Sequence, residues 1–469
     1  MIRLLNTYFP KRTVLLGISE ACLVILALIA ASAARLGAYP SSSSADWSGL
    51  RLLVLSMAFI TCMHYFDLYD SSVVTNRRGV LIGLGRVLIT MYLVLAVVDY
   101  VYPSLRLASG IFQVGFALAA VTLWLWRKLF SAISSIPQLA ERALIVGDGP
   151  LVEPLMRELE SRPELGIRVV GHLGERTDEP GFSSGESRTA FGDLGLDVGE
   201  KISRAVASLR VQRIVIAMGD RRGRLPVELL LSLKSRGVRV HDGTDVYEAV
   251  TGKLPVESVR LSWLLFSPGY YASPRFLLYK RLASLCISVL GLVITLPLVP
   301  FIVLAIKLTS RGRILYRQKR VGRDGVVFDC YKFRTMCEDA EADTGPTWAG
   351  DNDPRITPIG RFLRRTHIDE IPQLWNMLRG DMSFVGPRPE RPEFVSELRE
   401  KIPHYELRHA IRPGITGWAQ VRYKYGSSIE EATEKLRYDL FYIKNMTPGL
   451  DFLILVRTLK AIFMEHGAR

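Results

Sequence analysis

Five long apolar stretches constrain the fold of this chain more than any other feature of its sequence. Four follow one another near its beginning, at Val14–Ala34, Leu50–Phe66, Val80–Val101 and Ser109–Trp126. Each is close to the length of about 20 residues that a helix needs to cross a bilayer. Helices buried in a soluble core are the alternative, but four such stretches joined by short loops favour membrane spans. The sequence therefore predicts a four-helix transmembrane bundle over residues 1–130.

Charged residues predict the orientation of this bundle in the membrane. One side carries more basic residues than the other, namely Lys11, Arg12, Arg77, Arg78, Arg127 and Lys128. Basic loops are retained on the cytoplasmic side, so both ends of the bundle are expected there. The whole chain is also basic and apolar, with a net charge of +14 and 49% hydrophobic residues. The apolar stretches favour a lipid bilayer as the partner of such a chain, and no nucleic acid.

Short strands that alternate with helices predict a soluble α/β domain over residues 141–265. The expected strands are Ala143–Val146, Arg168–His172, Arg213–Ala217 and Val238–His241, and the expected helices are Leu151–Ser161 and Pro226–Arg236. This alternation is typical of a parallel, Rossmann-like sheet.

The first of these strands ends in Gly147-Asp148-Gly149, which resembles part of a dinucleotide-binding turn. Val152 stands where that fingerprint has its third glycine. A tight turn from strand to helix explains both glycines without any ligand. Nucleotide binding by this domain stays open on these residues.

The fifth apolar stretch, Leu282–Ile306, is also long enough to cross the membrane. Basic residues flank both of its ends, namely Lys280, Arg281, Lys307, Arg311 and Arg313. Both ends therefore carry the cytoplasmic charge signature. Pro297 and Pro300 near its middle each remove a helix hydrogen bond and bend the chain. A re-entrant helix that enters the membrane, breaks and returns satisfies both observations, and a full crossing is the alternative.

Two adjacent carboxylates, Asp369 and Glu370, stand at the centre of a stretch rich in arginine. A helix is expected from about Pro372 to Arg379, with Gly380 as its stop. Its positive end would help to keep both acids ionised. An ionised carboxylate pair among arginines suits phosphate and a divalent cation, although acids at helix entrances are also common structural features.

Several motifs now occur in a fixed order. They are Leu315–Thr335 (LYRQKRVGRDGVVFDCYKFRT), Asp353–Gly360 (DPRITPIG), Asp369–Asn376 (DEIPQLWN), Gly380–Pro392 (GDMSFVGPRPERP) and Pro413–Gln420 (PGITGWAQ). Together they closely resemble the bacterial polyprenyl-phosphate sugar-1-phosphate transferases, the monotopic phosphoglycosyl transferases. The resemblance implies a catalytic domain with a re-entrant membrane helix over residues 275–469. The expected fold class is therefore an α+β membrane protein that combines this domain with the bundle and the Rossmann-like module.

This resemblance also implies a reaction. A sugar-1-phosphate would pass from a UDP-sugar to undecaprenyl phosphate, with release of UMP, to begin exopolysaccharide synthesis. Asp369 would be the nucleophile that forms a phospho-sugar aspartate, and Glu370 would hold Mg²⁺ or assist proton transfer. The candidate substrate contacts are Lys332, Arg334, Arg355, Arg364, Arg388 and Asp439.

Some of these candidates also have local support in the sequence. The strand expected at Val326–Phe333 would project Lys332 and Arg334, which follows directly after it, to the same face. Two prolines stiffen the backbone around Arg388, whose planar guanidinium fits phosphate or a nucleobase edge. Asp439 matches an acidic position of the family, and the alternative for it is a helix-surface acid paired with a lysine.

The expected location is the bacterial inner membrane, with several spans and the catalytic domain on the cytoplasmic face, where nucleotide sugars occur. By the same resemblance the Rossmann-like domain would be regulatory or serve assembly, and a homodimer is compatible with this organisation. Three alternatives stay open: a nucleotide-sugar dehydratase or epimerase, a non-enzymatic assembly scaffold, and glycosyl transfer that leaves the phosphate on the nucleotide. The transferred sugar is not determined by the sequence.

Overall fold

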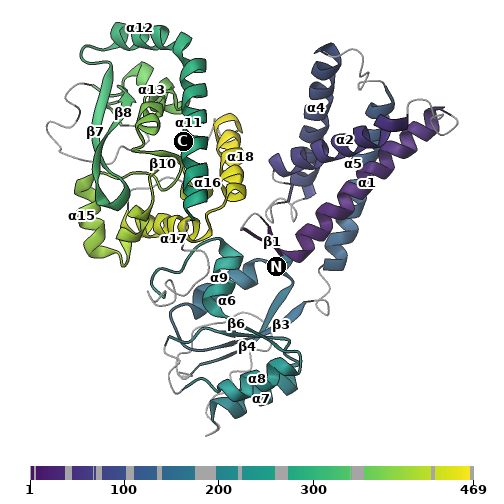
Figure 1. The fold of residues 1–469 in the computed structure, drawn as a ribbon. Coiled ribbons are helices and arrows are strands. Elements are labelled where there is room, and N and C mark those ends of the chain that lie inside the picture. The colour runs from purple at the N-terminus through teal and green to yellow at the C-terminus, as the bar shows by residue number, and fades with distance from the viewer. Residues whose placement is uncertain are drawn as a thin grey trace. The chain divides into compact units, whose positions relative to one another are not determined.

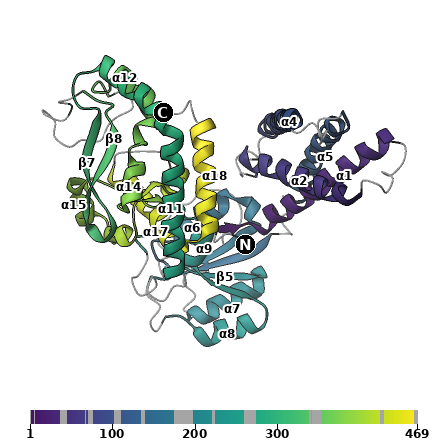
Figure 2. The same ribbon diagram turned by 45° about the horizontal axis from the view of Figure 1, so that its top comes forward.

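The computed structural model describes residues 2–4, 7–36, 45–66, 68–69, 77–101, 110–134, 140–174, 197–219, 224–258, 273–337, 340, 353–423 and 428–464. They form two compact units, one mainly of Tyr8–Val246 and the other mainly of Tyr247–Arg469. Figures 1 and 2 show the elements of each. A short strand pair, β1 (Ile2–Leu4) and β2 (Thr7–Phe9), precedes the first helix.

The first unit begins with a helical bundle. Its helices are α1 (Lys11–Leu36), α2 (Ala45–Tyr65), α4 (Arg77–Val101) and α5 (Gly110–Ser134). Val24, Phe59 and Leu123 are fully buried between them, while many leucines and valines face outward. An outward apolar surface is costly in water and favourable in lipid. A buried ion pair, Arg127 Nε to Glu20 Oε1 at 2.6 Å, joins α5 to α1.

Four helical segments of the described residues are long and apolar enough to cross a membrane. They are Arg12–Ala31, Gly79–Val98, Val114–Ile133 and Pro274–Thr309. Three of them coincide with predicted spans of the bundle. The second predicted span falls on α2, whose residues Leu53–Tyr65 form an apolar helical segment. These helices indicate a membrane protein.

A four-stranded sheet follows in the same unit. Its strands are β3 (Glu141–Val146), β4 (Ile167–Leu173), β5 (Arg213–Ile216) and β6 (Arg239–Asp242). They are all parallel, in the order β4-β3-β5-β6, so the predicted parallel sheet is confirmed. The accompanying helices are α6 (Val152–Ser161), η2 (Pro163–Leu165), α7 (Val198–Leu209) and α8 (Val227–Ser235), and α9 (Gly243–Thr251) begins in this unit and ends in the second.

Close backbone packing explains the two glycines that follow β3. Gly147 has a φ of 129°, and a Cβ there would lie 2.6 Å from the carbonyl carbon of Ala217. A Cβ on Gly149 would lie 2.7 Å from the oxygen of the same residue. Only glycine lets the end of β3 approach the chain after β5 this closely. The turn therefore needs no ligand to account for its glycines.

The second unit is organised along a broken apolar helix. It consists of α11 (Pro274–Thr295), the single turn η3 (Leu296–Leu298) and α12 (Val299–Thr309). Pro297 lies in η3, and Pro300 lies in the first turn of α12, where proline is tolerated. Figure 1 shows α12 turning away from the axis of α11 at this break. The side chains of Phe301 and Leu308 are 72% and 77% exposed, as expected for contact with lipid.

Mixed elements make up the rest of this unit. Strands β7 (Leu315–Val321) and β8 (Val327–Phe333) form an antiparallel hairpin, and η4 (Arg323–Gly325) joins them. The chain continues through α13 (Pro358–Arg365), η5 (Ile368–Glu370) and α14 (Gln373–Arg379). Strands β9 (Ser383–Val385) and β10 (Gly414–Thr416) pair in parallel, with α15 (Pro392–Lys401) and η6 (Tyr405–Ala410) between them. Helices α16 (Trp418–Arg422), α17 (Ile429–Asn445) and α18 (Pro448–Met464) complete it. The main core gathers around Trp418, Leu436 and Phe441.

Residues just after the boundary between the units belong to the second core. Leu254 and Val256 are buried with Trp418. Glu248 is also buried and accepts hydrogen bonds from Lys444 at 2.5 Å and Asn445 at 2.7 Å. The predicted domain end at residue 265 lies outside the described residues.

Candidate active site

The two carboxylates occupy the short turn η5. His367 has a φ of 56° and begins this turn, and α14 follows it after Ile371 and Pro372. The predicted helix agrees with α14, which ends at Gly380 with a φ of 96°. The acids therefore lie one turn before the helix and are buried, with Asp369 6% and Glu370 9% exposed.

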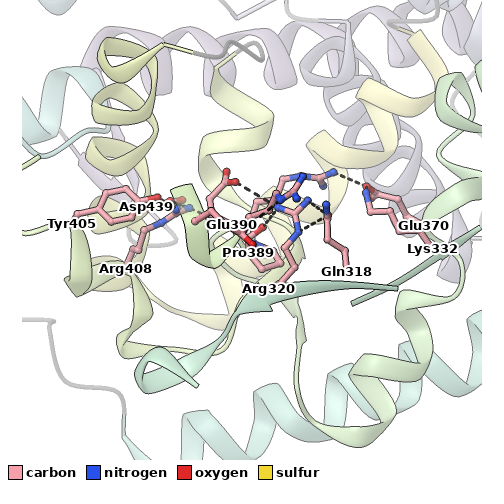
Figure 3. Close-up of polar contacts among 12 residues, drawn as sticks. Gln318, Arg320, Lys332, Glu370, Pro389, Glu390, Tyr405, Arg408 and Asp439 are labelled. Carbon is pink, nitrogen blue, oxygen red and sulfur yellow. Dashed lines mark hydrogen bonds and ion pairs between the residues drawn. The ribbon is translucent and has the colours of Figure 1, made fainter. Parts of the chain in front are cut away.

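Glu370 is held by cations from two other elements. Its Oε1 accepts hydrogen bonds from Lys332 Nζ on β8 at 2.8 Å and from Arg388 Nη2, beyond β9, at 2.6 Å (Figure 3). Burial raises the pKa of this carboxyl, but the charges of Arg388 and Lys332 outweigh burial and hold it well below its ordinary value. Glu370 thus keeps its negative charge and holds the side chains of Lys332 and Arg388 next to each other.

Asp369 differs from its neighbour although both are buried. Burial raises its pKa to about 6, the charge of Lys332 opposes this rise, and the charge of Glu370 adds to it. The sequence pattern pointed to the helix dipole, but burial dominates because α12 and α13 bring Ile302 and Leu363 close to η5. A carboxylate with a pKa near neutrality is ionised at pH 7 and a stronger base than ordinary aspartate.

Two arginines that the sequence analysis missed fix the backbone that carries Arg388. We call Arg320 and Arg408 the arginine clamp. Arg408 Nη2 donates to the carbonyl of Arg388 at 3.0 Å, and Arg320 Nη1 donates to the carbonyl of Pro389 at 2.9 Å. The clamp residues and Glu370 are thus joined through Arg388 and Pro389, and Figure 3 shows the labelled members of this network. The clamp sets where the guanidinium of Arg388 emerges.

Asp439 belongs to this network. Asp439 is 2% exposed, and its Oδ2 accepts a hydrogen bond of 2.8 Å from Arg408 Nη2. The other terminal nitrogen of Arg408, Nη1, donates to the hydroxyl of Tyr405 at 2.5 Å. Burial raises the pKa of Asp439 to about 6 although Arg408 lowers it. Asp439 is thus a buried acid rather than a helix-surface one. Its predicted contact with metal or substrate stays a prediction.

The other predicted cations lie in different surroundings. β8 ends at Phe333, so Arg334 leaves the strand and donates to the carbonyl oxygen of Ser310 at 2.9 Å instead of sharing the site of Lys332. Arg334 is buried. Two of its nitrogens, Nε and Nη1, are therefore buried without a hydrogen-bond partner among the described residues.

Arg364 and Arg355 complete the predicted set. Arg364 Nε donates to Thr335 Oγ1 at 2.9 Å, and burial lowers its pKa while Asp369 raises it. Arg355 forms a two-pronged ion pair with Asp353, at 2.8 Å from Nε and 2.5 Å from Nη2. The structure thus places Arg364 within the electrostatic reach of Asp369 and commits Arg355 to a local partner.

The expectation of Mg²⁺ at this site can be compared with the acidic side chains that the structure describes there. Within the ranges that the structure describes, no group of three His, Cys, Asp or Glu side chains could hold a metal ion. Mg²⁺ commonly takes one or two carboxylates and completes its shell with substrate phosphates and water. Glu370, next to Asp369, fits that limited role beside a diphosphate.

Comparisons with known proteins match this part of the chain. The model of the bacterial sugar transferase family matches residues 275–465. A UDP-N-acetylgalactosamine-undecaprenyl-phosphate N-acetylgalactosaminephosphotransferase of Aeromonas hydrophila is 37% identical over 232 residues, which are 50% of this chain and 54% of that protein. A UDP-glucose:undecaprenyl-phosphate glucose-1-phosphate transferase of Escherichia coli is 40% identical over 193 residues, 41% of each chain.

The chain thus spans about half the length of these relatives or less. A longer match joins it to the UDP-glucose:undecaprenyl-phosphate glucose-1-phosphate transferase of Xanthomonas campestris pv. campestris. The two are 31% identical over 338 residues, which are 70% of this chain and 68% of that protein. On this evidence the chain belongs to the family of bacterial sugar transferases.

Proposed function

We propose that this chain transfers a sugar-1-phosphate from a UDP-sugar to undecaprenyl phosphate and releases UMP. The observation that carries the proposal is the buried pair Asp369 and Glu370, of which one is a raised-pKa carboxylate and the other is fixed by Lys332 and Arg388. The names of the relatives support this class of donor and acceptor. The reaction would begin assembly of an extracellular polysaccharide.

In the first half of the reaction, an oxygen of Asp369 attacks the sugar-proximal phosphorus. A bond forms between them, and the bond from that phosphorus to the oxygen bridging the diphosphate breaks. UMP leaves with that electron pair, and the sugar-phosphoryl group stays on Asp369 as an acyl phosphate. Lys332 and Arg388 neutralise charge on the phosphoryl oxygens, which is the main catalytic task in phosphoryl transfer.

In the second half, a phosphate oxygen of undecaprenyl phosphate attacks the same phosphorus. The bond from phosphorus to Asp369 breaks, the carboxylate is restored, and polyprenyl-diphospho-sugar leaves. A divalent cation such as Mg²⁺ would supply positive charge for the diphosphate, with Glu370 as its protein ligand. Arg334, which binds Ser310 at the end of α12, and Arg364, which lies within the electrostatic reach of Asp369, are the proposed contacts for anionic groups of the substrates.

We further propose that α11 and α12 form a re-entrant hairpin. Arg281 near the start of α11 donates to the carbonyls of Met377 and Leu378, while Ile302 and Ile306 of α12 pack with Phe333. Both arms therefore contact the same folded unit, which supports a hairpin over a helix whose ends lie on opposite sides of a bilayer. An impermeant thiol reagent should fail to label a cysteine placed after Ile306 in intact cells, and labelling would refute the hairpin.

The remaining parts receive roles consistent with this topology. The catalytic unit lies on the cytoplasmic face of the inner membrane, where UDP-sugars are found. The parallel sheet is a Rossmann-like module with a regulatory or assembly role. A homodimer is part of the same proposal.

The nucleotide product tests the reaction directly. The purified full-length protein would receive Mg²⁺, undecaprenyl phosphate and each UDP-sugar of a panel, and the released nucleotide would be identified. UMP supports the proposal, and the productive donor names the sugar. UDP would mean glycosyl transfer without the phosphate and would refute the role given to Asp369.

A further inference from the structure

A second cationic site lies in the C-terminal unit near the start of α11. A cavity of about 240 Å³ is lined there by apolar side chains and by Lys280, Arg281, Arg323 and Arg412. None of the described residues that line it is acidic. Pockets for whole drug-sized ligands measure roughly 300–1,000 Å³, so this cavity suits a charged headgroup better than a complete nucleotide sugar.

Arg281 contributes a positive charge to this cavity, and its hydrogen-bond acceptors are uncharged. Its Nη1 and Nη2 donate to the carbonyls of Met377 at 2.6 Å and Leu378 at 2.7 Å, at the end of α14. These acceptors fix the guanidinium but are neutral groups. Lys280 differs, because Asp451 lies 3.5 Å from its Nζ and offsets its charge.

Arg412 and Arg323 approach the same cavity from other elements. Arg412 lies between η6 and β10, and Arg323 lies in η4 at the tip of the hairpin. Burial lowers the pKa of Arg412, and the positive charges of Arg281 and Arg323 lower it further. Only an exposed neighbour, Asp324 at 3.1 Å, pairs with Arg323 in the described structure. Converging cations of this kind are stabilised when an anion binds among them.

The apolar part of the lining points to the source of that anion. Leu277 of α11 lines the cavity, and its neighbours Leu278 and Leu282 are exposed, at 60% and 53%. In the re-entrant topology this end of α11 lies at the membrane surface. Basic side chains at that depth contact the phosphates of anionic lipids, while exposed leucines contact acyl chains.

We propose that this cavity binds the phosphate of an anionic membrane phospholipid whose acyl chains follow α11. The proposal rests on the membrane topology given above but not on the transfer reaction. The site is separate from the carboxylates, because Arg281 binds the end of α14 and η5 precedes its beginning. A helix of the length of α14 rises about 10 Å between these ends. A lipid bound there would hold α11 against β9 and α14.

Lipid retention by the full-length protein tests the proposal. The protein would be delipidated in detergent, incubated with phosphatidylglycerol and examined by native mass spectrometry. Arg412→Gln should weaken retention about tenfold, the scale of one lost charge-assisted hydrogen bond. Arg412→Lys keeps the charge and should retain most of the affinity. Arg399→Gln is the matched control, because Arg399 is exposed on α15 and pairs with Glu406.

Each outcome has a defined meaning. Selective loss in Arg412→Gln, with a melting temperature like that of Arg399→Gln, supports the site. Equal retention in all variants, or equal retention of zwitterionic phosphatidylcholine by the unmodified protein, overturns it. Binding of inorganic phosphate or UMP in place of phosphatidylglycerol would overturn the lipid source, and selective retention of undecaprenyl phosphate would assign the cavity to the acceptor. Lipid retention needs no turnover, so a failed transfer assay leaves this result intact.

Discussion

Two glycine-containing turns, each following a strand of a parallel pair, differ in what they present. The turn after β3 contains Gly147 and Gly149, and the turn after β9 contains Gly386. All three glycines are explained by backbone approach, since a Cβ on Gly386 would lie 2.5 Å from the carbonyl oxygen of Arg412. Glycine therefore does not separate a binding turn from a structural one.

The charged residues distinguish the turn after β3 from the turn after β9. Asp148 in the first turn is exposed. Arg388 in the second contacts a buried carboxylate, and the arginine clamp fixes its backbone. Burying so many charges costs several kcal/mol per ion before pairing, so stability alone is a poor reason for them. The comparison teaches that fixed, buried charge marks the proposed reaction site, and glycine marks only close packing.

Removal of the nucleophile should have the largest effect on turnover. Asp369→Asn keeps the shape of the side chain but cannot form the acyl phosphate, so turnover should fall at least about 1,000-fold. Incorporation of label from a sugar-labelled UDP-sugar into the protein should also disappear. Membrane insertion and melting temperature should persist. Near-normal turnover would contradict the assignment.

The arginine clamp should have the next largest effect. Arg408→Lys keeps the positive charge beside Asp439 but loses the forked geometry that also holds the carbonyl of Arg388. We expect a loss of about 10- to 100-fold in kcat/KM for the UDP-sugar, the range seen when residues supporting a site are changed. Arg399→Lys, on the exposed face of α15, is the control.

The step affected distinguishes positioning from general damage. UMP release in a single turnover depends on Arg388, so it should slow in Arg408→Lys while the melting temperature changes little. A fall in melting temperature with an unchanged rate of UMP release would mean that the clamp only stabilises the fold.

Local patterns predicted much of this molecule, and long-range contacts account for the remainder. The parallel strands and α14 followed from periodicity and from Pro372 and Gly380, which act within a few residues. The carboxylate pair followed from a motif. Arg408 and Arg320 had no such signal, because their acceptors at Arg388 and Pro389 lie 20 and 69 residues away in the chain.

The pKa of Asp369 is another property that the sequence did not predict. The sequence indicated two ionised acids near a helix end, and only the packing of α12 and α13 over η5 reveals that burial raises the pKa of Asp369. Arg355 is a local exception: it pairs with Asp353, only two residues away, and the sequence showed both residues without showing that they would pair. Burial and partner choice are properties of the folded chain that spacing does not encode.

The pH dependence of UMP release should show a moderate effect. In the proposed reaction Asp369 attacks as the carboxylate, and its pKa is about 6, so its reactive fraction falls as the pH drops through 6. The rate should decrease about tenfold at pH 5 and be nearly constant above pH 7. Asp439 also has a pKa of about 6, so Asp439→Asn is the necessary control. A profile that loses its slope in this variant would assign the titration to Asp439.

Gly147→Ala should have the smallest effect on turnover and is the sharpest test of the comparison. The new Cβ would clash with Ala217 at a φ of 129°, which should destabilise the first unit by about 1–3 kcal/mol. Limited proteolysis and thermal unfolding would measure that loss. Turnover per folded molecule should stay within about twofold of the unmodified protein if the turn is structural, because Gly147 belongs to the first compact unit and the carboxylates to the second, and changes at independent sites usually have separate effects. Lost turnover in protein that remains folded would instead show that the turn after β3 communicates with the reaction, and the contrast between the two turns would fail.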